Sequence, residues 1–217
     1  MRELWLIRHA QASFGAADYD KLSDLGHDQS RALGQALARL GMVPDAVFIG
    51  AQRRHRETWD GINAALNLGE PGVLPGFNEF DFKGLLNARF GANRPSDLHT
   101  DRKTHFRALR ETVLDWQAGR IADPPEAFDA FAARVRHARA QAVAGGERVM
   151  VVTSGGAIGF SVAELMGAPA DAMIRLQLQI KNCAVTRIVA TSGGEHLSTF
   201  NETPHIDADT PHFLTYS

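Results

Sequence analysis

The sequence predicts an α/β fold, namely a three-layer α/β/α sandwich around a mostly parallel sheet with at least one antiparallel strand. Two observations favour this class. Apolar runs of four or five residues, too short for helices, alternate with longer segments of helical periodicity, and such runs are typical of strands covered on both faces. Near the C-terminus, strand-like segments at 184–190 and 196–200 flank a Ser-Gly-Gly-Glu turn, which predicts an antiparallel hairpin.

The first predicted unit is a strand over residues 3–7 that ends at Arg8 and His9. Residues 11–19 have no periodicity and are expected to form a loop. Ser23 is a suitable N-cap for a helix that extends to about Leu40 and stops at Gly41. The apolar face of this helix is predicted to contain Leu25, Leu33, Ala36, Leu37 and Leu40.

The second unit is a strand over 46–49 followed by a helix over 53–66. Arg54 therefore falls where a strand gives way to a helix N-terminus, and both settings favour anions. Residues 69–95 are rich in glycine, proline and asparagine, so we expect mainly a loop with a short strand at 73–74.

The rest of the chain continues the alternation within a single domain, residues 1–217. Residues 94–120 are polar and basic and contain a helix at 104–117, so we expect this segment to be a cap or insertion over one end of the sheet. Further elements are predicted as helices at about 125–144, 157–166 and 170–177, with a third buried strand at 149–152.

Composition limits the classes of function. A formal net charge of -2 over 217 residues gives no general attraction to nucleic acid or to an anionic membrane, so any anion must be bound by local arginines. The single cysteine, Cys183, excludes an internal disulfide and is expected in the core. The sequence starts without a leader and has no apolar stretch long enough to cross a bilayer, so we expect a cytoplasmic protein. The oligomeric state is not determined by the sequence.

Three of the predicted strands end in polar sequence: Arg8-His9, Gln52-Arg53-Arg54 and Thr153-Ser154-Gly155-Gly156. Ligands of open α/β sheets bind beyond the carboxyl ends of the strands, so we expect these ends to meet. Arg8 and Arg54 would disfavour protonation of His9, whose reference pKa is about 6.5, and would keep it nucleophilic. The same guanidiniums suit a phosphoryl group, which predicts a phosphohistidine intermediate.

At this point the sequence resembles the histidine phosphatase superfamily, which includes the cofactor-dependent phosphoglycerate mutases. The similar segments follow the family order across most of the chain. The family's Arg-His-Gly is similar to Arg8-His9-Ala10, its Leu-Thr-x-x-Gly-x-x-Gln to residues 22–29, its Ser-x-x-x-Arg-x-x-x-Thr to residues 50–58, its Glu in a glycine-rich stretch to Glu79, and its Asn-x-x-x-His-Leu to residues 201–206.

The resemblance implies a role for each of four residues. His9 is the nucleophile, Arg8 and Arg54 bind the phosphoryl group, and Glu79 is the general acid that later activates water. The sequence around Glu79 independently supports its role as the acid, because phenylalanines at 77, 80 and 82 are placed to remove it from water and raise its pKa. Asp81 is the rival for this role.

One departure bears on catalysis. The family ends its third strand with Ser-His-Gly-Gly, whose histidine contacts the phosphoryl group, whereas this chain has Thr153-Ser154-Gly155-Gly156. Serine keeps a hydrogen bond but no charge. Loss of one transition-state donor typically costs ~10²–10³ in rate, whereas enzymes gain ~10⁶-fold or more, so a slow phosphatase and a phosphate-binding protein without turnover both stay open.

The anion at this strand end would also be favoured by the backbone N–H groups of Gly155 and Gly156. His55, His99 and His105 are the candidates to replace the absent histidine. Ala10 in place of glycine, together with a loop at 11–15 that lacks the mutases' polar substrate cradle, favours hydrolysis of a small phosphomonoester over mutase activity. No cofactor or metal is predicted.

Two rival interpretations are weaker. A serine hydrolase would use Ser154 as nucleophile with a downstream histidine such as His205, but Val152 stands where a nucleophile elbow has glycine. A metal site from Asp97, His99, Asp101 and His105 has irregular spacing, and a solvated polar segment explains these residues better.

Overall fold

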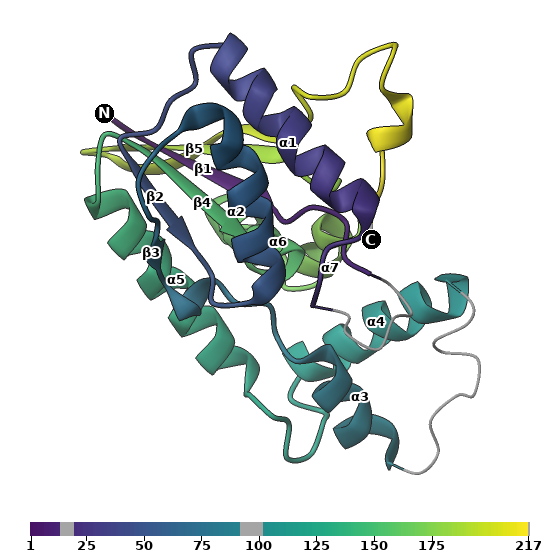
Figure 1. Ribbon diagram of the computed structural model, residues 1–217. Coiled ribbons are helices and arrows are strands. Elements are labelled where there is room, and N and C mark those ends of the chain that lie inside the picture. Colours follow the sequence, from purple (N-terminus) through teal and green to yellow (C-terminus); the bar gives the residue numbers. More distant parts are fainter. Residues whose placement is uncertain (14–19, 92–101, 217) are drawn as a thin grey trace.

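A computed structural model describes residues 1–13, 20–91 and 102–216 of the chain. These residues contain a six-stranded sheet in the order β3-β2-β4-β1-β5-β6 (Figure 1). The strands are β1 (Arg2–Arg8), β2 (Ala46–Ile49), β3 (Gly72–Val73), β4 (Arg148–Thr153), β5 (Val185–Thr191) and β6 (Gly194–Glu202).

The sheet is mixed, as predicted. β1, β2 and β3 run parallel to their neighbours on the β4 side, and β5 and β6 form the antiparallel hairpin at the other edge. The strands β1 and β4 lie at the centre and are buried on both faces, which explains their uninterrupted apolar sequence.

Helices cover both faces of the sheet, so the three-layer architecture is confirmed (Figure 1). On one face, Trp5, Ile7 and Val152 pack with Leu33 and Trp59 of two helices, α1 and α2. On the other face, a larger core joins the sheet to the remaining layer. The helices of the two layers are α1 (Asp24–Arg39) and α2 (Arg53–Leu66), and α5 (Phe128–Ala144), α6 (Gly155–Leu165) and α7 (Ala172–Gln177).

Two further helices, α3 (Phe82–Phe90) and α4 (Arg102–Gln117), lie beyond the lower end of the sheet in Figure 1. Leu86 of α3 packs on Ala108 of α4, and the far half of α4 joins the main core through Val113 and Trp116. The assignment of 94–120 as a cap stays a prediction, because residues 94–101 lie outside the described part of the chain.

Several sequence predictions of elements are corrected by the structure. The helix α3 lies where we expected a loop, because Asp81 caps it by accepting a hydrogen bond from Gly84 N at 2.8 Å. The helix α5 begins at Phe128 and not near residue 125. Leu40, predicted on the apolar face of the first helix, is 56% exposed because α1 ends at Arg39.

Candidate functional site

The polar ends of the three central strands meet, as the sequence predicts. The register of β1 and β4 pairs Arg8 with Thr153, and the backbone N–H of His9 donates to Thr153 O at 2.8 Å. On the other side of β4, Gly50 N donates to Val152 O at 3.1 Å, which brings the start of α2 to the same edge. His9, Ser154 and the first turn of α2 therefore share one edge of the sheet.

His9 is held in a form suited to nucleophilic attack. Its Nδ1 lies 2.8 Å from the carbonyl oxygen of Ala10, a contact in which Nδ1–H donates and Nε2 keeps its lone pair. The backbone is held from the opposite side, since Asn182 Nδ2 donates to His9 O at 3.0 Å. Burial, followed by the charges of Arg54 and Arg8, holds the pKa of His9 well below its usual value, so the imidazole is neutral at neutral pH.

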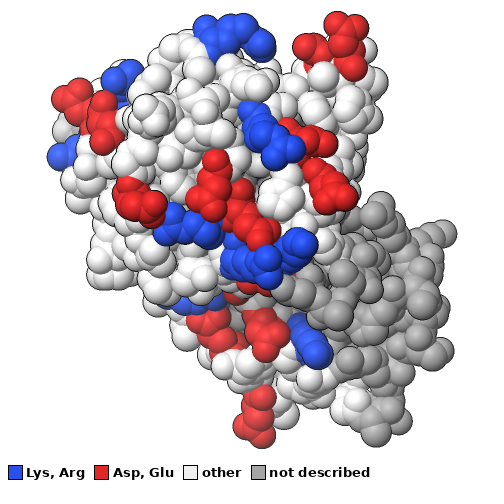
Figure 2. Space-filling model, in the orientation of Figure 1, with Lys and Arg blue, Asp and Glu red and all other residues white. Residues whose placement is uncertain are grey.

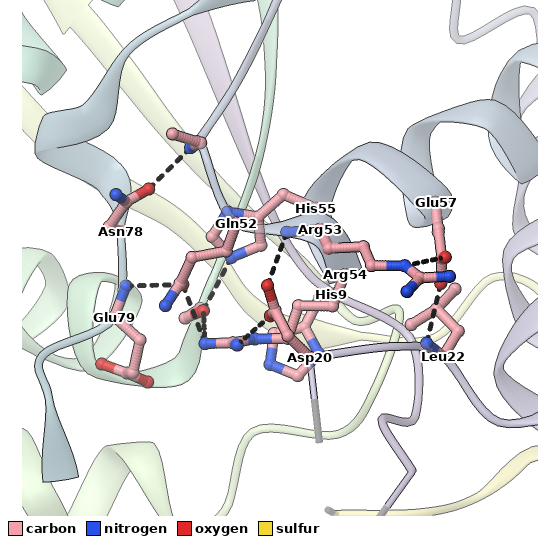
Figure 3. Close-up of polar contacts among 12 residues, drawn as sticks. His9, Asp20, Leu22, Gln52, Arg53, Arg54, His55, Glu57, Asn78 and Glu79 are labelled. Atoms are coloured by element: carbon pink, nitrogen blue, oxygen red, sulfur yellow. Dashed lines mark hydrogen bonds and ion pairs between the residues drawn. The ribbon is translucent and has the colours of Figure 1, made fainter. Parts of the chain in front are cut away.

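Arg54 lies in the first turn of α2 and is 5% exposed. Its Nη1 forms an ion pair with Asp20, and its Nη2 donates to Gln52 Oε1 at 2.8 Å and to Ser154 Oγ at 3.4 Å (Figure 3). The predicted phosphate-binding guanidinium is therefore fixed from both sides at the edge of the sheet, and a carboxylate contacts it.

Arg8 is anchored at the end of β1 by the backbone of distant segments. Its Nη1 donates to the carbonyl oxygens of Ile180 and Tyr216, the latter at 2.8 Å. A Cβ placed on Gly155 would lie 3.6 Å from Arg8 Nε, so the guanidinium passes beside the N-terminus of α6. The structure thus brings Arg8 and Gly155 together, as their predicted common role requires.

Glu79 approaches the same N-terminus from the loop after β3. Its Oε2 accepts from Gly156 N at 2.9 Å and from Gln177 Nε2 at 3.4 Å. Burial raises the pKa of Glu79 against the opposing effects of the Gly156 N–H and of Arg54. A carboxyl group with a raised pKa is suited to proton transfer near neutrality.

Two details of the carboxylate region differ from the sequence predictions. Gly156 N–H was predicted to favour a bound anion from solution, but it binds the Glu79 carboxylate instead. Asp81, the rival acid, is exposed and serves as the cap of α3. Of the two carboxylates, Glu79 is the one at the edge of the sheet.

Ser154 is fully buried, and its hydroxyl contacts a histidine from another element. Ser154 Oγ lies 2.7 Å from Nε2 of His55, which follows Arg54 in α2. The rings of His55 and His9 are 5.9 Å apart between centroids, at an angle of 38°. Burial, followed by the charge of Arg54, holds the pKa of His55 well below its usual value.

Of the three histidines considered as replacements, the structure brings His55 to the strand ends. His105 instead packs edge-on against Phe82, with ring centroids 5.5 Å apart. His99 lies outside the described residues.

Sequence reasoning missed three polar residues of the site. Asp20 binds Arg54, Gln52 accepts from both Arg54 and the backbone N–H of Glu79, and Gln177 donates to the Glu79 carboxylate. Gln52 had a usable signal, because it directly precedes the arginines at a strand end. Asp20 lies in a segment without periodicity, Gln177 ends a predicted helix that carries no motif, and only the fold brings them to the site.

The rival interpretations are not supported by the geometry. Ser154 contacts His55, whereas His205 is buried against Phe213 and lines a separate cavity of about 340 Å³ beside α1. For the metal interpretation, Asp97, His99 and Asp101 lie outside the described residues. Within residues 1–13, 20–91 and 102–216, no group of three or more His, Cys, Asp or Glu side chains is placed to hold a metal ion.

The surface and the helices add two observations. On the face drawn in Figure 2, acidic and basic side chains are interspersed. None of the helices in the described ranges has the length and apolar character needed to cross a bilayer.

The model of the histidine phosphatase superfamily (branch 1) matches residues 4–203. No curated protein sequence matches the chain significantly.

Several solved structures with the same fold are phosphatases by name. A mycobacterial glucosyl-3-phosphoglycerate phosphatase in complex with inorganic phosphate is 22% identical, with a TM-score of 0.67, and the match covers 95% of this chain and 100% of that chain. The α-ribazole phosphatase from Shigella flexneri is 23% identical, with a TM-score of 0.66, and coverage is 93% of this chain and 96% of that one. A phosphoserine phosphatase mutant from Entamoeba histolytica, in complex with phosphoserine, is 16% identical over 95% of this chain and 100% of its own, with a TM-score of 0.65.

Proposed function

The chain belongs to the histidine phosphatase superfamily, and from this membership we propose that it hydrolyses a small phosphomonoester through a phosphohistidine at His9. The observation that carries the proposal is the state of His9. Its Nδ1 contacts Ala10 O, and burial, followed by the charges of Arg54 and Arg8, holds its pKa well below the usual value and keeps it neutral. This combination leaves Nε2 as the nucleophile beside two groups that bind phosphate bidentately.

In the first step, Nε2 of His9 attacks phosphorus and the P–O bond to the leaving alcohol breaks. Glu79, whose pKa is raised by burial, acts as the general acid and donates a proton to the departing oxygen. Arg8, Arg54 and the Ser154 hydroxyl stabilise the oxygens of the phosphoryl group as charge develops on them.

In the second step, the Glu79 carboxylate accepts a proton from water while the water oxygen attacks phosphorus. The P–N bond breaks, and inorganic phosphate and neutral His9 are released. Gly156 N–H and Gln177 hold the carboxylate in place through both steps. Because Ser154 supplies a neutral donor where the family signature has a histidine, we expect slower turnover than in members with that histidine.

The names of the similar structures favour a substrate with one phosphate on a small organic molecule. We propose the same class for this chain, acting in the cytoplasm, without a cofactor or metal and without nucleic acid or membrane as partner. Residues 94–120 are proposed to cap the site, and mutase activity is not proposed.

A second candidate function is binding of a phosphorylated ligand or protein partner without turnover. It is favoured by the Asp20 carboxylate, which contacts the guanidinium of Arg54 that phosphate needs. A phosphate that binds Arg54 must displace this carboxylate or bear its repulsion. Either cost weakens phosphate binding and slows any reaction.

The test is turnover of p-nitrophenyl phosphate by the wild type and by His9→Ala and Arg54→Ala variants, with His137→Ala on the exposed face of α5 as the control. We expect turnover by the wild type and the control, none above background for His9→Ala, and at least ~10²-fold loss for Arg54→Ala. Equal background rates for the wild type and His9→Ala, together with binding of inorganic phosphate, would establish the non-catalytic function instead.

A further inference from the structure

Two unusual residues of the site both lie against His55. Ser154 stands where the family signature has a histidine, Gly50 stands where the signature of the second segment has a serine, and His55 lies between them. His55 Nε2 is 2.7 Å from Ser154 Oγ, and a Cβ on Gly50 would lie 2.3 Å from His55 Nδ1. A side chain at position 50 is therefore incompatible with the observed place of the His55 ring.

The contact between His55 and Ser154 lies beside the predicted phosphate site. Ser154 Oγ is also 3.4 Å from Nη2 of Arg54, and the His55 ring lies 5.9 Å from the ring of His9. Both His55 and Ser154 are fully buried. Burial of a hydroxyl and an imidazole is costly unless they bind each other, so the pair has one fixed geometry.

We infer that His55 replaces the absent histidine of β4 through one intervening hydrogen bond: its Nε2 bonds to Ser154 Oγ and holds the Ser154 hydroxyl beside Arg54, at the phosphoryl group. His55 is a positioning residue, and Ser154 is the group that touches substrate. The pair supplies an oriented donor at the N-terminus of α6. Gly50 is the residue that makes room for the imidazole.

The inference rests on the proposed phosphatase activity and adds a specific arrangement to it. The three residues form one unit, so that a change in any of them has the same consequence for the Ser154 hydroxyl. It follows that kcat should fall by similar factors in His55→Ala and in Ser154→Ala. In the double variant the two factors should not multiply.

The test uses amide side chains that match the two ring nitrogens. In His55→Gln the amide nitrogen takes the place of Nε2 and still reaches Ser154, whereas in His55→Asn it takes the place of Nδ1 and does not. We expect His55→Asn and His55→Ala to lose about 10-fold to 100-fold in kcat for p-nitrophenyl phosphate, with KM changed less than about 3-fold, and His55→Gln to recover most of the loss. Affinity for orthovanadate, a transition-state mimic, should fall in parallel with kcat, while affinity for inorganic phosphate should change little.

Two further variants keep the proposal testable where a buried substitution disturbs folding. Gly50→Ala should reproduce the loss of His55→Ala by displacing the imidazole, while Gly69→Ala, where a Cβ meets nothing within 4 Å, should not. The variant His55→Ala with Ser154→His returns an imidazole to β4 and should exceed His55→Ala alone in kcat. Thermal unfolding of each variant separates loss of fold from loss of the donor.

The outcomes separate this inference from the proposed function. Full wild-type turnover in His55→Ala, or equal losses in His55→Gln and His55→Asn variants that remain folded, would overturn the inference and leave the phosphatase proposal standing. A different outcome is a wild type that shows no turnover while affinity for orthovanadate falls in His55→Asn but not in His55→Gln. That result would retain the pair as a binding device and reject the phosphatase proposal.

Discussion

At the residue scale, the site depends on neutral side chains placed beside cationic ones. His9 and His55 are buried, Arg54 lowers the pKa of each, and Glu79 is kept out of water beside Gly156. The proposed site therefore holds a neutral imidazole and a carboxyl group with a raised pKa in one place, which is the pairing that phosphoryl transfer through histidine requires.

Gly156 is predicted to be necessary for the position of the Glu79 carboxylate. A Cβ at this residue would lie 2.1 Å from Glu79 Oε1 and 2.7 Å from the ring of Phe80. Gly156→Ala should push the carboxylate off the helix N-terminus and lower kcat by about 100-fold, because misplacement by about 1 Å has effects of this size. Gly193→Ala, in the exposed hairpin turn, is the matched control in steady-state assays, and an unchanged kcat in Gly156→Ala would reject the role of this contact.

The proximity of the proposed site residues could be predicted from the sequence, but their contacts could not. Arg8 and His9 stand at the end of β1, and Arg54 lies in the first turn of the helix after β2. Parallel pairing of both strands with β4 therefore predicts that these residues meet. The bond between Ser154 and His55 depends on which way two side chains point at the end of β4 and in the first turn of α2. Asp20 and Gln177 reach the site from segments 34 and 98 residues away from their partners, and no local pattern reports such contacts.

At the element scale, the close packing of α1 on α2 sets the position of the first turn of α2, which we propose to bind phosphate. A Cβ on Gly34 of α1 would lie 2.3 Å from the backbone oxygen of Ile62 in α2. The helices approach to backbone contact at this point, and α2 carries Arg54 and His55 at its N-terminus.

Gly34→Ala is therefore expected to destabilise the protein even though alanine favours helices. The gain in helix propensity is up to about 1 kcal/mol, while overpacking against a backbone atom costs ~1–3 kcal/mol and moves α2. Denaturant unfolding should show a net loss, and steady-state assays a lower kcat. Gly69→Ala, in open space, is the control, and a Gly34→Ala variant as stable as the wild type would contradict this account of the helix pair.

Elements with strong periodicity or sharp punctuation were predicted within one to three residues, and α2 was predicted with its observed bounds. The helix α3 was missed because its nine residues, Phe82–Phe90, include a glycine, have no amphipathic period of their own, and follow a stretch in which phenylalanines and acidic residues alternate. Its helical state depends on the Asp81 cap and on packing of Leu85 and Leu86 into two different cores.

At the scale of the whole molecule, buried neutral histidines couple stability to pH. Burial lowers the pKa of His205 to about 4, and burial is also the first cause that lowers the pKa of His9 and of His55. The unfolded chain binds protons at these residues near pH 6.5, whereas the folded protein does not until the pH is far lower. The folded state is therefore favoured above pH 6.5 and loses stability as the pH falls toward 4.

The predicted loss from His205 alone is ~3 kcal/mol by pH 4, and His9 and His55 add to it. Denaturant unfolding between pH 7 and pH 4 should show a free energy of unfolding that decreases steadily. His205→Phe should reduce the slope, while His137→Ala, on the exposed face of α5, should not. A free energy of unfolding that is independent of pH over this range would contradict the neutral state of the buried histidines.

The covalent state of His9 during turnover tests the central claim most directly. The Glu79→Gln variant is mixed with p-nitrophenyl phosphate, whose leaving group needs little protonation, and quenched in base; loss of the water-activating carboxylate should let the phosphoenzyme accumulate. The account predicts alkali-stable, acid-labile phosphate mapped to His9 in this variant, less of it in the wild type, and none in His9→Ala. The absence of labelling in both Glu79→Gln and the wild type, or acid-stable phosphate on Ser154, would contradict the account.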